Sequence, residues 1–139
     1  MQPLIWQIDD TSHWHEVTDA TLARLPVALR CEHFHSGHAG LLAWQGAASH
    51  GGLPDLVLMD FYIGSERGDD VAQALRQVEP AGHHAVIVGF SSVPSASQRI
   101  ADACGGIALP KVANHAGINP ELLAMLRKWL DPAATERPD

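Results

Sequence analysis

Short apolar segments alternate with segments of helical periodicity along most of this chain. Branched apolar residues dominate five short runs, which favours β-strands. The segments between them carry apolar residues three or four positions apart, as on one face of a helix. Strands that are apolar at nearly every position are buried on both faces, and alternation with helices indicates a parallel sheet covered on both sides. We therefore predict a (βα)5 three-layer α/β sandwich with strands at residues 4–8, 27–34, 56–59, 86–90 and 106–109.

The last predicted helix is the most clearly marked. Asn119 can cap its N-terminus, Pro120 suits its first position, and we expect it to end near Leu130. Residues 46–54, GAASHGGLP, are predicted to form a loop. We expect one domain over residues 1–130 and a short flexible tail at residues 131–139. The positions with helical periodicity are Trp14, Val17, Thr21 and Leu25; Leu41, Trp44 and Ala48; Val71, Ala74, Leu75 and Val78; a weaker stretch over residues 96–104; and Leu122, Met125, Leu126 and Trp129.

Charge and cysteine content argue against several classes of function. Lys and Arg total 9 against 16 Asp and Glu, and the resulting net charge of -7 repels the phosphate backbone of nucleic acid. Cys31 and Cys104 lie in apolar surroundings without a CxxC spacing, which indicates packed, reduced thiols. No apolar run approaches the ~20 residues that span a bilayer, and the N-terminus lacks a signal-peptide layout. We expect a cytoplasmic protein that binds neither nucleic acid nor membrane.

Chemically active side chains follow the ends of the predicted strands. Two carboxylates follow the first strand, one follows the third, two hydroxyls follow the fourth, and a lysine follows the fifth. In open parallel sheets, ligands bind beyond the carboxyl ends of the strands. Three neighbouring carboxylates repel one another unless a cation neutralises them, and oxygen ligands of this kind suit Mg²⁺. The residues predicted to gather at this edge are Asp9, Asp10, Asp60, Ser91, Ser92 and Lys111.

Five pieces of sequence, in this order, resemble the receiver domains of two-component response regulators. They are IDD at 8–10, PDLVLMD at 54–60, the Gly64 and Gly68 loop leading into DDVAQALR, VIVGFSS at 86–92, and LPK at 109–111. The resemblance extends over about residues 3–130. It implies a flavodoxin-like fold with a parallel sheet of order 2-1-3-4-5, and a single-domain receiver that acts as a Mg²⁺-dependent phosphorylation switch or phosphorelay element.

The resemblance also implies a role for each polar residue at the strand ends. Asp60 accepts a phosphoryl group from a sensor histidine kinase or a histidine phosphotransfer protein. The metal ligands are Asp9, Asp10, Asp60 and the backbone carbonyl of Tyr62. A carboxylate beside Mg²⁺ needs little further covalent help for a loose phosphoryl transfer.

The resemblance also implies that hydroxyl, ammonium and backbone N–H groups bind the phosphoryl group. Ser91 and Lys111 contact the phosphoryl group, and the backbone N–H of Ser92 contributes to its binding. We expect no attached effector domain, so the output would require a separate protein target. We expect that target, or a second copy in a homodimer, to dock on the fourth helix, fifth strand and fifth helix.

The sequence departs from the receiver pattern at several positions. Ala108 stands where the family usually has an aromatic residue, and Val112 follows the lysine in place of a proline, so we expect a trans peptide bond there. The segment FYIGSERG replaces the common methionine-proline turn. We expect the protein to catalyse its own phosphoryl transfer. Neither Tyr62 nor Val93 carries a carboxylate or amide to orient water, so we expect slow dephosphorylation.

Three other interpretations of the strand-end residues are possible. A flavin-binding electron carrier would need a phosphate loop where this chain has Asp9 and Asp10. A haloacid-dehalogenase-type phosphatase would need an aspartate at Tyr62. The principal alternative is a pseudo-receiver that binds a protein partner without phosphorylation.

The histidines of HFHSGH (33–38), together with His83 and His84, are interpreted as solvated residues of an edge strand and loops, not as a metal site.

Overall fold

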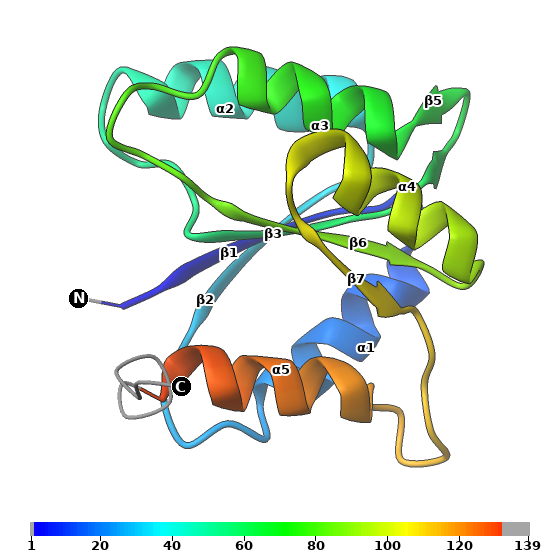
Figure 1. The fold of residues 1–139 in the computed structure, drawn as a ribbon. Helices are drawn as coiled ribbons and strands as arrows, with labels where there is room; N and C mark the ends of the chain where they lie inside the picture. The colour runs from blue at the N-terminus through cyan, green and yellow to red at the C-terminus, as the bar shows by residue number, and fades with distance from the viewer. Residues whose placement is uncertain (1, 132–139) are drawn as a thin grey trace, which may run out of the picture.

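The computed structural model describes residues 2–131 and has a five-stranded parallel sheet between two layers of helices (Figure 1). Residues 132–139, most of the predicted tail, lie outside the described residues. The sheet strands, in spatial order, are β2 (Arg30–Phe34), β1 (Leu4–Ile8), β3 (Leu56–Met59), β6 (Val86–Ser91) and β7 (Ile107–Pro110). The helices are α1 (Ser12–Leu22), α2 (Gly37–Ala48), α3 (Gly68–Gln77), α4 (Pro94–Cys104) and α5 (Pro120–Leu130), and a hairpin is formed by β4 (Tyr62–Ile63) and β5 (Glu66–Arg67).

The predicted (βα)5 sandwich and its strand order are confirmed. Without the two hairpin strands, β6 and β7 are the fourth and fifth strands, so the order is 2-1-3-4-5. All four strand pairs are parallel, as the continuous apolar character of the strands predicts. None of the helices within residues 2–131 is long and apolar enough to cross a membrane.

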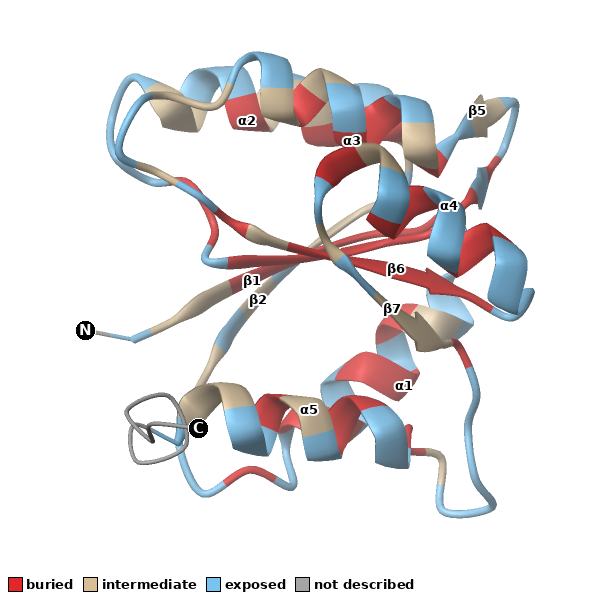
Figure 2. Cartoon of the chain, in the orientation of Figure 1, coloured by how far each residue is buried: buried red, intermediate tan, exposed pale blue. Residues whose placement is uncertain are grey.

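Each strand sends alternate side chains into two separate halves of the core. On β3, Leu56 and Leu58 pack with α1 and α5, whereas Val57 and Met59 pack with α2, α3 and α4. Figure 2 shows the central strands buried along their length, with the buried positions of each helix facing the sheet. Burial on both faces is what makes these strands apolar at every position.

The structure corrects two predicted boundaries. Residues 46–48 belong to α2 and not to a loop, because Ala47 and Ala48 pack against the core despite the small-residue composition of this segment. The second strand begins at Arg30 and not at Val27, which is 47% exposed. Among the described residues it pairs only with β1, and this pairing begins at Leu4 opposite Arg30. The length of β1 therefore limits the ladder.

The segment FYIGSERG forms the antiparallel hairpin β4–β5, which the sequence did not predict. Tyr62 pairs with Arg67 and Ile63 with Glu66, and Gly64 turns between them with φ of +60°. Such a positive φ suits glycine. Ile63 is buried in the core below the turn, so a single apolar anchor fixes the hairpin next to the carboxyl end of β3.

The predicted boundaries of the last helix are confirmed. Asn119 accepts hydrogen bonds from the backbone N–H groups of Glu121 and Leu122 at 3.0 and 3.1 Å, and α5 ends at Leu130. The Asn119 amide also donates to the carbonyl of Pro110 at 2.9 Å. This residue therefore joins the start of α5 to the end of β7, next to the predicted site.

Candidate functional site

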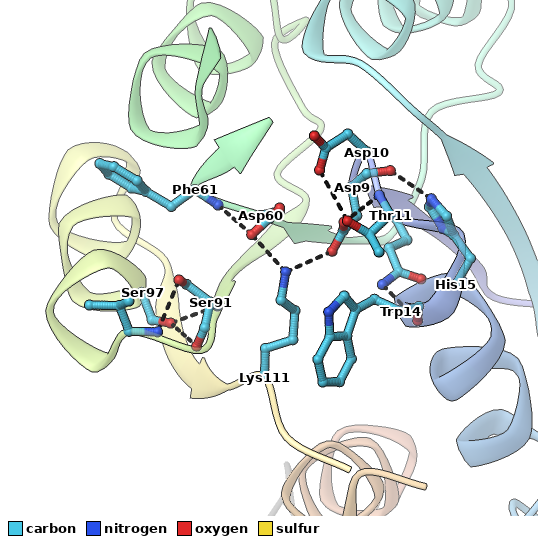
Figure 3. Close-up of polar contacts among 12 residues, drawn as sticks. Asp9, Asp10, Thr11, Trp14, His15, Asp60, Phe61, Ser91, Ser97 and Lys111 are labelled. Atoms are coloured by element: carbon cyan, nitrogen blue, oxygen red, sulfur yellow. Dashed lines mark hydrogen bonds and ion pairs between the residues drawn. The ribbon is translucent and has the colours of Figure 1, made fainter. Parts of the chain in front are cut away.

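Three carboxylates predicted to meet at the sheet edge are brought together there. One carboxylate oxygen from each of Asp9, Asp10 and Asp60 lies within 4.8 Å of the others. The sheet ladder continues past the strands to place two of them, since Asp9 donates its N–H to Phe34 and Asp60 donates its N–H to Ile8, both at 3.0 Å. Figure 3 shows these side chains converging beyond β1 and β3.

Lys111 completes the cluster from the end of β7. Its ammonium Nζ donates to Oδ2 of Asp9 at 3.0 Å and to Oδ1 of Asp60 at 2.9 Å (Figure 3). The lysine side chain is 8% exposed, and Nζ lies 5.3 Å from the centre of the Trp14 ring, within range of a cation–π contact. The backbone N–H of Lys111 donates to the carbonyl of Ser91, which fixes the lysine relative to β6.

Asp60 is buried but keeps one carboxylate oxygen without a hydrogen bond in the described part of the chain. Its side chain is 5% exposed, and both of its hydrogen bonds, from Lys111 and from the N–H of Phe61, fall on Oδ1. Among the described residues no group donates to Oδ2, so this oxygen is the one left for a ligand. Burial raises the pKa of Asp60, the hydrogen bond from Lys111 opposes the rise, and the charge of Asp9 adds to it.

Asp10 lies at the solvent-exposed side of the cluster. Its Oδ2 accepts a hydrogen bond from the N–H of Gly64 at 2.9 Å, which ties the β4–β5 hairpin to the end of β1. Asp9, in contrast, is buried, and its Oδ1 accepts from the N–H of Thr11 at 2.9 Å. The pair therefore offers one buried carboxylate and one that faces solvent.

The donor set fits a hard divalent cation. It consists of carboxylate oxygens only, with one oxygen of each aspartate close to the other two, and a cation there offsets negative charge that Lys111 alone leaves in excess. Ions such as Mg²⁺ and Mn²⁺ favour this kind of ligand, whereas softer ions favour imidazole and thiolate.

The predicted hydroxyl groups lie at the end of β6 but do not contact the cluster. Ser91 is buried, and its hydroxyl accepts from the N–H of Val93 at 3.1 Å. Ser92 is exposed. Neither residue forms a hydrogen bond with the side chains of Asp60 or Lys111 in the described part of the chain. Tyr62, whose carbonyl is a predicted metal ligand, lies in β4 with an exposed side chain.

Ser97 and Gly68 support the site, and sequence reasoning gave neither of them a structural role. The Ser97 hydroxyl accepts from the N–H of Ser91 at 2.8 Å and lies 3.0 Å from the Leu109 carbonyl, so it joins α4 to both strands. A Cβ on Gly68 would lie 1.9 Å from the carbonyl oxygen of Asp60. The glycine of the GDD segment at the start of α3 was a usable signal for this close approach. A serine within a helix gives no comparable signal.

The structure places the residues at which the sequence departs from the receiver pattern. Ala108 lies in β7, where it pairs with Gly89 of β6. No peptide bond between residues 2 and 131 is cis, so the expectation of a trans bond before Val112 is confirmed.

Several histidines have polar partners that the sequence did not predict. The prediction of a solvated side chain is wrong for His33, which is 23% exposed, because α1 lies against it. His33 Nδ1 lies 2.6 Å from Nδ1 of His15, and His15 Nε2 lies 2.7 Å from the Asp9 carbonyl oxygen. Burial lowers the pKa of His15. His83 Nε2 also has a partner, the Pro54 carbonyl oxygen at 2.9 Å, whereas His84 is exposed as predicted.

Several solved structures that share this fold are response regulators or their receiver domains. A CheY-like receiver domain from Methylobacillus flagellatus has a TM-score of 0.69 at 18% identity, covering 91% of this chain and 98% of its own. The phosphorylated cyanobacterial phytochrome response regulator RcpA has a TM-score of 0.70 at 16% identity, covering 100% of this chain and 98% of its own. The Mn²⁺-bound form of response regulator Rcp1 has a TM-score of 0.69 at 16% identity, with coverages of 94% and 96%.

The chain therefore has the flavodoxin-like fold of response-regulator receiver domains, and the resemblance stated from the sequence is confirmed at the level of fold. No family model matches the chain. No curated protein matches it in sequence either. At such low identity the shared fold does not assign an activity, so the argument for function depends on the cluster of Asp9, Asp10, Asp60 and Lys111.

Proposed function

We propose that this chain is a receiver domain, a Mg²⁺-dependent phosphorylation switch or phosphorelay element that accepts a phosphoryl group on Asp60. The observation that carries the proposal is the position of the Lys111 ammonium between Asp9 and Asp60, with Asp10 alongside. A structural ion pair would not need a third carboxylate at the solvent side. The arrangement instead provides a nucleophile, a cation and metal ligands at the carboxyl edge of a parallel sheet.

The chemistry requires few steps. Oδ2 of Asp60 attacks the phosphorus atom, an oxygen–phosphorus bond forms, and the bond from phosphorus to the donor breaks with its electron pair going to the donor. The donor is a phosphohistidine of a sensor histidine kinase or phosphotransfer protein. Lys111 stays close to Oδ1 and offsets negative charge on the transferred group.

The carboxylates of Asp9, Asp10 and Asp60, with the backbone carbonyl of Tyr62, would hold the metal. When bound, Mg²⁺ supplies charge neutralisation to the phosphoryl oxygens. Phe61 and Lys111 hold Oδ1 of Asp60 by hydrogen bonds and thereby fix the direction in which Oδ2 of Asp60 points. This orients the nucleophile toward the incoming phosphoryl group.

Ser91 and Ser92 bind the phosphoryl group once Asp60 is phosphorylated. The Ser91 hydroxyl exchanges its contact with the Val93 N–H for one with the phosphoryl group, and the Ser92 N–H donates a second hydrogen bond. The exposed Tyr62 and Val93 side chains carry no carboxylate or amide to orient an attacking water, so the acyl phosphate is hydrolysed slowly.

The output of the switch is a change at the surface of α4, β7 and α5. Ser91 and Ser97 connect the end of β6 to α4 and β7, which gives a path from the phosphoryl group to this surface. The partner is a protein target or a second copy of the chain. Ile107, 41% exposed on the edge strand β7, is an apolar contact available to it.

The test is intact-mass analysis after incubation with acetyl phosphate, with and without Mg²⁺. We expect the wild type to gain one phosphoryl group only with Mg²⁺, and Asp60→Asn to gain none. Asp102→Asn, which removes an exposed carboxylate on α4, is the matched control and should behave as the wild type. Failure of the wild type to gain mass with Mg²⁺ would instead favour a pseudo-receiver that binds its partner without phosphorylation.

A further inference from the structure

A second group of ligand-type side chains lies between β2 and α1, outside the carboxylate cluster. Cys31 and His33 are two positions apart on β2, so they project from the same face of the strand. His15 and Asp19 are four positions apart on α1, so they share the helix face that meets it. Strand spacing of two and helix spacing of four place four such side chains at one interface.

These side chains form a continuous series of polar contacts. Asp19 Oδ1 lies 2.8 Å from His33 Nε2, His33 Nδ1 lies 2.6 Å from His15 Nδ1, and His15 Nε2 lies 2.7 Å from the carbonyl oxygen of Asp9. One ligand atom from each of Asp19, Cys31 and His33 lies within 4.8 Å of the other two. The Asp19 side chain is 57% exposed, so the group is open to solvent at the edge strand.

The hydrogen bonds of this series are compatible with a cation on the Asp19 side of His33. The two ends of the series, a carboxylate and a carbonyl oxygen, only accept hydrogen bonds, so three contacts require three protons. Two neutral imidazoles supply two. A cation on the Asp19 side of His33 removes the shortage: His33 Nδ1–H then donates to His15, and His15 Nε2–H donates to the Asp9 carbonyl.

We propose that Asp19, Cys31 and Nε2 of His33 bind a transition-metal ion, of which Zn²⁺ is the best suited, at the open edge between α1 and β2. Thiolate, imidazole and carboxylate are the ligands that Zn²⁺ takes, and three protein ligands leave a fourth tetrahedral position for water. A proton in the same place would use neither the thiol nor the converging geometry.

His15 orients the metal ligand His33. Ligating histidines commonly use their second ring nitrogen in a hydrogen bond that fixes the tautomer, and Nδ1 of His33 is held in this way by His15. Burial raises the pKa of Cys31 to about 12, so its thiol stays protonated until the metal displaces the proton. The site does not depend on the proposed phosphorylation, because it shares no side chain with the carboxylate cluster.

The experiment is titration of the apo-protein with Co²⁺, followed by displacement with Zn²⁺. Co²⁺ bound by a thiolate gives an intense ligand-to-metal charge-transfer band, so we expect this band in the wild type at a stoichiometry of one. Cys31→Ser should abolish the band, and Cys104→Ser, which removes the other thiol of the chain, should keep it. Far-UV circular dichroism of each variant checks that the fold is retained.

Further variants separate this site from other metal-binding groups. We expect Asp19→Asn and His33→Gln each to weaken Co²⁺ binding at least tenfold. His38→Asn, which alters an exposed histidine of α2, should bind as the wild type. Asp60→Asn and a large excess of Mg²⁺ should leave the band unchanged, because the carboxylate cluster prefers hard ions. The proposal is overturned if a correctly folded wild type shows no band, if the band survives in Cys31→Ser, or if it is lost in Asp60→Asn.

Discussion

Lys111 places one positive charge between two buried carboxylates, those of Asp9 and Asp60, and a third carboxylate lies at the exposed side. Removing one partner of a buried ion pair leaves charge without compensation, which is costlier than the net contribution of the pair itself. A divalent cation at the same place would take over part of this compensation. The lysine and the metal are therefore expected to substitute for one another in stabilising the folded state.

Lys111→Met tests this compensation. In the presence of a chelator we expect it to lower the free energy of unfolding by about 3 kcal/mol, the scale for breaking a buried pair. Saturating Mg²⁺ should recover a clear part of that loss. Urea unfolding with EDTA or Mg²⁺ measures both quantities. Lys128→Met on the exposed face of α5 is the control, and equal effects of the two substitutions would contradict the account.

Residues at strand ends were predictable because parallel strands bring their carboxyl ends to one edge of the sheet. This argument predicted the gathering of Asp9, Asp10 and Asp60, whose proximity the structure shows. It could not find Ser97 or His15, because their contacts depend on how α4 and α1 are rotated against the sheet. Helical periodicity gives the buried face but not which polar atom on that face meets a partner.

At the scale of elements, the β4–β5 hairpin is the feature that the sequence did not predict. Strands of two residues give no periodicity to detect, and the hairpin depends on the tertiary burial of Ile63. The α2 boundary failed for a related reason, since Ala47 and Ala48 are helical because they pack on the core. For both the hairpin and the end of α2, tertiary contacts override the preference of the local sequence.

Gly68 follows this hairpin and lies against the backbone of Asp60, and Gly68→Ala tests this close approach. Because its new Cβ would lie 1.9 Å from the Asp60 carbonyl oxygen, the backbone of one of the two must move. We expect a loss of more than about 2 kcal/mol in the free energy of unfolding, the scale of overpacking in a core. Phosphorylation by acetyl phosphate should also slow.

Gly46→Ala is the matched control. Gly46 lies in α2, and a Cβ there meets nothing within 4 Å. Alanine should therefore stabilise the helix by up to about 1 kcal/mol. If Gly68→Ala were as stable and as reactive as this control, the close approach to Asp60 would not shape the site.

At the scale of the whole molecule, folding is what brings the proposed metal ligands together. Asp9 and Asp10 precede Asp60 by about fifty positions, and only the pairing of β1 with β3 brings them together. A net charge of -7 adds to the repulsion that a cation relieves. An ion that binds only the folded chain shifts the folding equilibrium toward it.

Mg²⁺ is therefore expected to stabilise the protein. At one hundred times its dissociation constant it should add about 2.7 kcal/mol to the free energy of unfolding, measured by urea unfolding. Asp10→Asn should remove most of this increase by taking away the exposed ligand, while Asp102→Asn should retain it. An equal increase in all three proteins would mean that Mg²⁺ acts elsewhere.

The most direct measurement of the central claim locates the phosphoryl group. After incubation with acetyl phosphate and Mg²⁺, borohydride reduction converts an aspartyl phosphate to homoserine, which peptide mass spectrometry can place in the sequence. The account predicts homoserine at position 60 and at no other aspartate. Homoserine at Asp9, Asp10 or an exposed aspartate, with residue 60 unchanged, would contradict it.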